Sequence, residues 1–140
     1  RIVRLSTPEK VNQEVFYMID RIEKEMGGTP DTALANFYNN SPYSFSDTTQ
    51  KAVKHLIKTP IMLISEPDIQ WWLKERGYDQ SYNNTTDHTA MINELQKLGN
   101  NNAVLVTTTD KGFRKPNNLK HPHSWSIADP DQVIKWLQSQ

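Results

Sequence analysis

Residues 121–126 read His-Pro-His-Ser-Trp-Ser and place two of the four histidines beside aromatic and hydroxyl side chains. Imidazole titrates near neutral pH, so a histidine is suited to take a proton from a hydroxyl nucleophile and to return it later. Such a histidine works with a carboxylate that fixes its tautomer and stabilises its charged form. Asp68, three residues beyond an apolar run that ends at Ser65, is the candidate for this acid. The pattern predicts proton-transfer chemistry between an upstream acid and residues 121–126, hereafter the histidine segment.

Two short apolar runs would position these groups. Residues 61–65 (IMLIS) and 103–107 (AVLVT) are typical of parallel strands that are buried on both faces. Helical spacing and caps predict a helix from residue 69 to about Gly77, one capped by Asp87 and one capped by Asp129, with residues 108–126 as a loop. Because active groups lie beyond the carboxyl ends of strands in open α/β sheets, the acid and the histidine segment are expected at one edge.

The first 58 residues carry a helical pattern instead. A short strand is allowed at residues 2–5, and a capping box at residues 6–9 starts a helix that two glycines, at 27 and 28, bring to an end. A second, shorter helix is predicted after Pro30, and a third is predicted to be capped by Asp47. We therefore divide the chain into a helical segment, residues 1–58, and a strand–helix–strand–helix part, residues 59–140.

Two parallel strands are too few for a stable sheet, because parallel strands need both faces and both edges covered. The remaining strands are expected to come from outside this sequence, with at best one contribution from residues 2–5. We therefore interpret the chain as the C-terminal portion of a larger α/β domain. It is expected to be poorly soluble or partly molten unless partner strands or an oligomer complete the sheet.

From about residue 40 onward the chain resembles α/β-hydrolases of the esterase/lipase type. SPYSFSDTTQKAVKHLIKTPIMLISEPD is similar to the family's helix, core strand and acid turn, and NNAVLVTTTDKGFRKPNNLKHPHSWSIADPDQVIKWL to its last strand, histidine loop and closing helix. Two details depart from the family pattern. Glu66 and Pro67 stand where a small-residue turn is usual, and His-Pro-His stands where Gly-His is common. The helices before Ser41 fall where the family often inserts a cap over the active site.

The resemblance implies a serine-type hydrolase that acts on an ester or related acyl bond of a small molecule, without a cofactor. The order acid, then histidine, matches the second half of that fold. The Gly-X-Ser-X-Gly nucleophile and the oxyanion-hole segment are missing from this sequence, so the resemblance places them on an N-terminal segment or a partner chain. The 140 residues alone are expected to be inactive.

Alternatives stay open for each group. His123 is the preferred base because a small residue and an aromatic follow it, and His121 is its rival. Asp68 is the preferred acid, although it could merely cap the helix that follows it. Asp79 and Asp87 are the other candidate acids.

Two adjacent tryptophans follow the acid. Trp71 and Trp72 are expected to contribute to a substrate pocket, with Trp72 more directly in the core because it shares a helix face with Ile69 and Leu73. A metal site for zinc or iron, built from the two segment histidines with Asp68 and Asp87, is a competing hypothesis, and we predict that no metal is bound.

Composition excludes several classes of function. Sixteen basic and sixteen acidic residues cancel without a block of like charge, so nucleic-acid binding and a membrane-surface patch are not expected. The apolar runs are too short to span a bilayer. The absence of cysteine excludes disulfides, thiolate metal sites and cysteine catalysis, and leaves cytoplasm and periplasm both compatible. A non-catalytic α/β module that binds a ligand or a protein is the alternative function.

Overall fold

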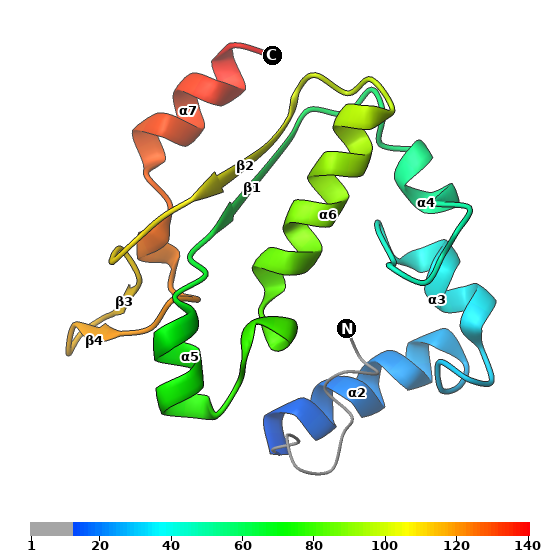
Figure 1. Ribbon diagram of the computed structural model, residues 1–140, viewed down its shortest axis with the longest axis horizontal. Coiled ribbons are helices and arrows are strands. Elements are labelled where there is room, and N and C mark those ends of the chain that lie inside the picture. Colours follow the sequence, from blue (N-terminus) through cyan, green and yellow to red (C-terminus); the bar gives the residue numbers. More distant parts are fainter. Residues whose placement is uncertain (1–12) are drawn as a thin grey trace.

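The computed structural model describes residues 13–140, with side chains from residue 16 onward (Figure 1). The predicted strand at residues 2–5 and the capping box at residues 6–9 lie outside the described residues. The helices and strands follow in the order α2 (Gln13–Met26), α3 (Leu34–Asn40), α4 (Lys51–Lys54), β1 (Ile61–Ser65), α5 (Ile69–Arg76), η1 (Gln80–Tyr82), α6 (Asn84–Lys97), β2 (Ala103–Thr107), β3 (Phe113–Arg114), β4 (Leu119–Lys120), η2 (Trp125–Ile127) and α7 (Pro130–Gln138).

The two apolar runs form the parallel pair that their composition predicts. β1 and β2 lie side by side with Ile61 opposite Ala103 and Ser65 opposite Thr107. The helix α6 connects back along this pair and packs against both strands (Figure 1). The fold is therefore mixed helix and strand, with a small two-stranded parallel sheet at its centre.

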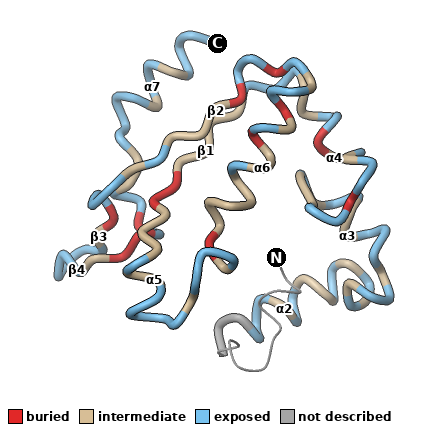
Figure 2. The backbone as a smooth tube through the Cα atoms, in the orientation of Figure 1, coloured by how far each residue is buried: buried red, intermediate tan, exposed pale blue. Residues whose placement is uncertain are grey.

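The buried core of the described residues lies at the amino end of the sheet. Its fully buried apolar side chains are Val53 of α4, Ile92 and Leu95 of α6, and Ala103 of β2. Val53, with Tyr43 and Leu56 packed beside it, thus joins the residues around α4 to the core of the strand-bearing part. Figure 2 shows how few positions are buried along the chain. Because the core gathers at the amino end, the carboxyl ends of the strands are left for loops and polar groups.

Burial on both faces of the strands is not found in the described chain. Most residues of β1 and β2 are only partly buried, and Ser65 and Ala103 are the fully buried ones. The last helix, α7, leaves Ile134 and Leu137 more than half exposed. An amphipathic helix normally buries such a stripe against a neighbouring element. The apolar surface of this α/β unit is therefore only partly covered by the described residues.

Helix ends follow local chemistry, although two of the predicted caps, Asp47 and Asp87, do not cap their helices. α5 ends at Gly77, whose φ of 63° suits glycine, and Asp129 caps α7 by accepting from the backbone N–H of residues 131 and 132. Asp87 does not cap α6, because the helix begins one turn earlier with Asn83 as its cap. The Asn83 amide oxygen accepts from Thr85 N at 2.8 Å, so the cap residue is an asparagine that the pattern of apolar positions did not single out.

The predicted loop between β2 and α7 is more ordered than expected. Residues 113–114 and 119–120 pair as a short antiparallel hairpin, β3–β4. Ser126 closes this hairpin: its Oγ donates to Lys111 O at 2.6 Å and accepts from Phe113 N at 2.7 Å. These local bonds give the histidine segment a defined position rather than a free loop conformation.

The predicted helix after Asp47 is a single turn, α4, and Asp47 does not cap it, because its N-cap residue is Gln50. The Asp47 carboxylate accepts from the N–H and hydroxyl of Thr49 at 2.9 and 2.7 Å, and from Lys51 N at 3.4 Å. The Thr49 hydroxyl is the main cause that lowers the pKa of Asp47, and the backbone N–H donors add to it against the opposing effect of burial. Asp47 therefore fixes the turn that leads into α4.

Candidate functional site at the carboxyl end of the parallel strands

Asp68 lies just beyond β1, where the sequence places the acid. Its backbone has a φ of 24°, an uncommon value for a residue other than glycine. The Oδ1 atom accepts from Trp71 N at 3.2 Å, so Asp68 does cap α5. The Oδ2 atom lies 2.6 Å from Lys120 Nζ in a half-shielded ion pair. Asp68 therefore combines a helix-capping role with a charged contact to the hairpin that precedes the histidine segment.

Lys120 joins two carboxylates at this edge. Its ammonium group donates to Asp110 Oδ1 at 2.6 Å and pairs with Asp68 at the same distance. Both contacts, that with Asp110 first, raise the pKa of Lys120 above its ordinary value. Because Lys120 directly precedes His121, this pair fixes the acid turn and the start of the histidine segment next to each other.

The two histidines of the segment lie in different environments. His121 is 8% exposed, whereas His123 is exposed. The Nδ1 atom of His121 accepts a hydrogen bond from His123 N at 3.2 Å. A backbone N–H can only donate, so in its neutral form His121 carries its proton on Nε2. That is the opposite of the tautomer that a base oriented by a carboxylate at Nδ1 requires.

The tryptophans of α5 pack around these imidazoles. The ring of His121 lies 5.1 Å from that of Trp71 and 5.8 Å from that of Trp72, and the ring of His123 lies 4.6 Å from Trp72. Trp72 in turn stacks on Tyr78 at 6.4 Å. Both tryptophans are partly buried, and the predicted partner of Trp72 on its helix face, Leu73, is half exposed. The structure brings Asp68, both tryptophans and both histidines of the segment to one edge of the sheet.

Glu66 is a buried charged residue that the residue pattern did not mark as part of the site. It directly follows β1 and is 1% exposed. Its Oε2 atom accepts from Thr108 Oγ1 at 3.0 Å and from Lys111 N at 2.8 Å, and its Oε1 atom accepts from Gly112 N at 3.1 Å. The sequence signal was its position: a glutamate directly after an apolar strand needs hydrogen-bond partners if it is buried there.

The two other candidate acids, Asp79 and Asp87, belong to a 3-10 turn and to a helix rather than to the loop after β1. Asp79 caps η1 by accepting from the N–H and hydroxyl of Ser81 at 2.8 and 2.6 Å. Asp87 lies inside the first turns of α6. Across residues 13–140, no group of three or more His, Asp or Glu side chains is arranged to hold a metal ion.

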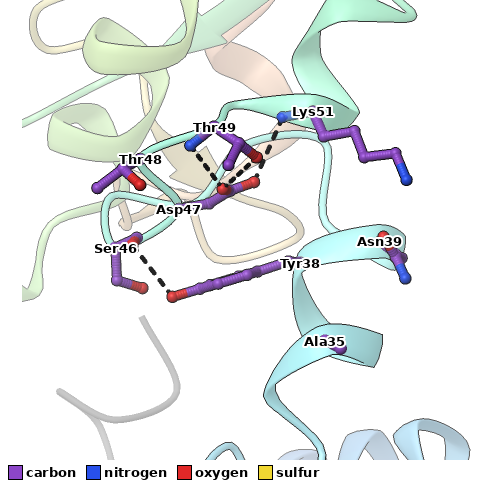
Figure 3. A pocket seen from close by; sticks show the side chains of 8 residues that line it. All are labelled: Ala35, Tyr38, Asn39, Ser46, Asp47, Thr48, Thr49 and Lys51. Atoms are coloured by element: carbon purple, nitrogen blue, oxygen red, sulfur yellow. Dashed lines mark hydrogen bonds between the residues drawn. The ribbon is translucent and has the colours of Figure 1, made fainter.

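Two hollows flank α3. The smaller, about 350 Å³, lies between α3 and the turn before α4, and its polar groups bond to one another: Asp47 holds Thr49, and the Tyr38 hydroxyl donates to Ser46 O at 3.1 Å (Figure 3).

The larger hollow, about 860 Å³, is an open groove between α3, residues 41–46 and the start of α6. Four aromatic side chains form part of its wall beside polar residues of the loop and of α6: Phe37, Tyr38, Tyr43 and Phe45, the last two with ring centroids 5.4 Å apart. Its volume lies in the range of small-molecule sites. Burial, then the nearby carboxylates of α6, raise the pKa of Tyr43.

Among the described helices, none is both long and apolar enough to cross a bilayer. Comparison of the chain with protein-family models, with curated proteins and with solved structures finds no match.

Proposed function

We propose that this chain carries the acid and the base of a serine-type α/β-hydrolase that cleaves an ester or related acyl bond. One observation carries the proposal: the loops at the carboxyl ends of β1 and β2 meet, through the 2.6 Å ion pair of Asp68 with Lys120. In an open α/β sheet this edge is where reacting groups gather. The strand–acid–helix–strand–histidine–helix order is the order in which α/β-hydrolases supply these groups.

His123 is the proposed general base. The residue is exposed, and its ring packs on Trp72 of the helix that Asp68 caps. His121 is a poorer candidate because it is buried and its Nδ1 atom accepts from His123 N. Asp68 would orient His123, while Lys120 pairs with the same carboxylate. Trp71 and Trp72 would form one wall of the substrate site.

The serine nucleophile is proposed to come from a segment that completes the sheet. Two observations support a partner for the described residues. The strands are only partly buried, and α7 leaves Ile134 and Leu137 exposed although its apolar stripe is strong. Additional parallel strands would cover these surfaces and would bring a strand-to-helix turn with its nucleophile to the same edge.

The aromatic groove is proposed to receive the acyl part of the substrate. Its lining includes neither Asp68 nor the histidine segment; it approaches them through Asn83, which donates to Pro67 O at 2.6 Å and directly precedes Asn84 of the groove wall. Apolar aromatic walls favour an acyl group that is itself apolar. We therefore expect longer acyl esters to be cleaved with a lower KM than acetate esters.

The test compares the 140-residue chain with a version that includes whatever sequence precedes Arg1 in the gene. A fluorophosphonate probe should label no serine in the shorter chain and one serine in the longer. In the longer protein, His123→Gln and Asp68→Asn should each lower kcat toward a p-nitrophenyl ester by about 10³- to 10⁴-fold. His121→Gln is the matched control and should cost far less.

Two results would contradict the proposal. One is labelling of a serine within the 140 residues. The other is hydrolysis by the longer protein that does not depend on His123 or Asp68.

The second candidate function is a binding module without catalysis. The hydrogen bond from Trp71 N to Asp68 favours it, because this contact gives the carboxylate a purely structural role as a helix cap. It predicts no probe labelling in either version.

A further inference from the structure

Glu66 and Asp68 lie two residues apart after β1, but their carboxylates form hydrogen bonds and ion pairs with different parts of the chain. Asp68 caps α5 and pairs with Lys120 at the outer edge. Glu66 is almost completely buried and turns to the loop after β2, where three donors surround its carboxylate: one hydroxyl and two consecutive backbone N–H groups. Three donors match the acceptor-only character of an ionised carboxylate.

The donors to Glu66 are mainly backbone groups, so the carboxylate fixes the path of the chain. Lys111 N and Gly112 N donate at 2.8 and 3.1 Å, and Thr108 adds its hydroxyl at 3.0 Å. All three residues belong to the loop between β2 and the β3–β4 hairpin. A side chain that merely filled space at the strand end would not need to bond two successive N–H groups of one loop.

Gly112 passes this constraint on to the histidine segment. Its N–H donates to Glu66, and its carbonyl accepts from His121 N at 2.8 Å. The glycine is buried so closely that an added Cβ would lie 2.6 Å from His121 O and 2.7 Å from Pro122 Cα. His121 Nδ1 then accepts from His123 N. A continuous series of direct hydrogen bonds thus joins the Glu66 carboxylate to the backbone of His123.

We propose that Glu66 is a positioning residue for the histidine segment: its buried carboxylate fixes residues 111–112, and these fix the backbone that carries His121 and His123. This inference rests on the proposed function, in which His123 is the base. It also gives a reason for the departure from the small-residue turn at Glu66. The long side chain of Glu66 reaches from the end of β1 to the loop after β2 and holds that loop in place.

The test measures the histidine segment itself. Glu66→Gln keeps the size of the side chain but turns one acceptor into an NH₂ donor that faces an N–H group. Amide hydrogen exchange at Gly112 and His121 should become about 10- to 100-fold faster, because at least one buried donor loses its acceptor. The imidazole nitrogen signals of His121 and His123 should also shift, since the hydrogen bond to His121 Nδ1 is disturbed.

Glu75→Gln is the matched control, because Glu75 lies on α5, is 47% exposed and pairs only loosely with Lys74 at 3.7 Å. It should leave exchange and imidazole signals unchanged. A merely structural role of Glu66 predicts instead that exchange rises equally at Leu95 and in β2. That uniform rise, or unchanged exchange at His121 in a folded Glu66→Gln protein, would overturn the inference.

Thr108→Val provides a second, milder variant should Glu66→Gln fail to fold. It removes one of the three donors and keeps the shape of the side chain, so the same residues should respond to a smaller extent. No response at Gly112 and His121 in that variant overturns the inference as well. These readouts need no hydrolysis, so loss of the proposed function leaves them intact: if the segment loosens but hydrolysis never depends on His123, the positioning stands and the proposed function fails.

Discussion

Replacing Gly112 with alanine tests how closely the loop after β2 meets the histidine segment. The added Cβ would lie 2.6 Å from His121 O, 2.7 Å from Pro122 Cα and 3.0 Å from His121 C. All three are backbone atoms, so no side-chain rotation can relieve the clash. Ordinary van der Waals contact begins at 3.4 Å, so one of the two backbones must move by about 0.8 Å.

The expected cost of Gly112→Ala follows from this displacement. Overpacking of a well-packed site destabilises by about 1–3 kcal/mol, and we expect a free energy of unfolding lowered by that amount. The same shift applied to a base in a hydrolase would lower kcat by about 10²-fold, since misplacement by an ångström has that effect on reacting groups. Urea unfolding followed by tryptophan fluorescence measures the first quantity; under the proposed function, ester hydrolysis measures the second.

Gly27→Ala is the control for Gly112→Ala. Gly27 has a φ of 77° but only one atom within 4 Å of an added Cβ, at 3.9 Å. Its substitution therefore reports the cost of a left-handed backbone without a clash, about 1 kcal/mol. If Gly112→Ala unfolds at the same urea concentration as the unaltered chain and leaves the His121 amide signal in place, the close approach of Gly112 to His121 and Pro122 is wrong.

Two further predictions concern the hydrophobic core and the loss of stability at low pH. Leu95 is fully buried, so Leu95→Ala should lower the free energy of unfolding by about 2–5 kcal/mol. Leu73 is half exposed on α5, so Leu73→Ala should lower it by less than about 1 kcal/mol. Urea unfolding of both variants measures these losses, and equal losses would contradict the placement of the core. The pKa of Asp47 is lowered in the folded chain, chiefly by Thr49, so its contribution to stability is present above its ordinary pKa of about 4 and is lost as pH falls through the lowered value. The difference in Tm between the unaltered chain and Asp47→Asn should therefore shrink below about pH 4, and a difference that stays constant from pH 6 to pH 2 would refute it.

The exposed apolar residues show what a pattern leaves open. Helical spacing correctly placed α7, and its cap, Asp129, is where the sequence predicts it. Ile134 and Leu137 belong to the apolar stripe of this helix, yet both are more than half exposed among the described residues. A stripe of apolar side chains predicts that a helix has a face to bury. It contains no information about which element lies opposite, since that depends on the rest of the sheet.

Hydrogen-bond partners separate Glu66 from Asp68. Both carboxylates follow β1, and from the sequence only the spacing to the strand and the resemblance distinguished them. In the structure, Glu66 is buried among donors from a loop more than forty residues later, whereas Asp68 pairs with Lys120. Sequence distance hides such partners, because the hydrogen bonds form only once the two strands are aligned.

The sequence alone determined the local elements. Apolar runs of five residues predicted β1 and β2 and their parallel pairing, and the glycine at 77 and the aspartate at 129 marked helix ends, because strand composition and caps depend on neighbouring residues. Only the tertiary structure decided the roles at the edge of the sheet: the buried His121 accepts a hydrogen bond at Nδ1, His123 is exposed, and Glu66 is joined to both through Gly112. Proton position and burial are set by contacts between distant segments, and those exist only when the chain is folded.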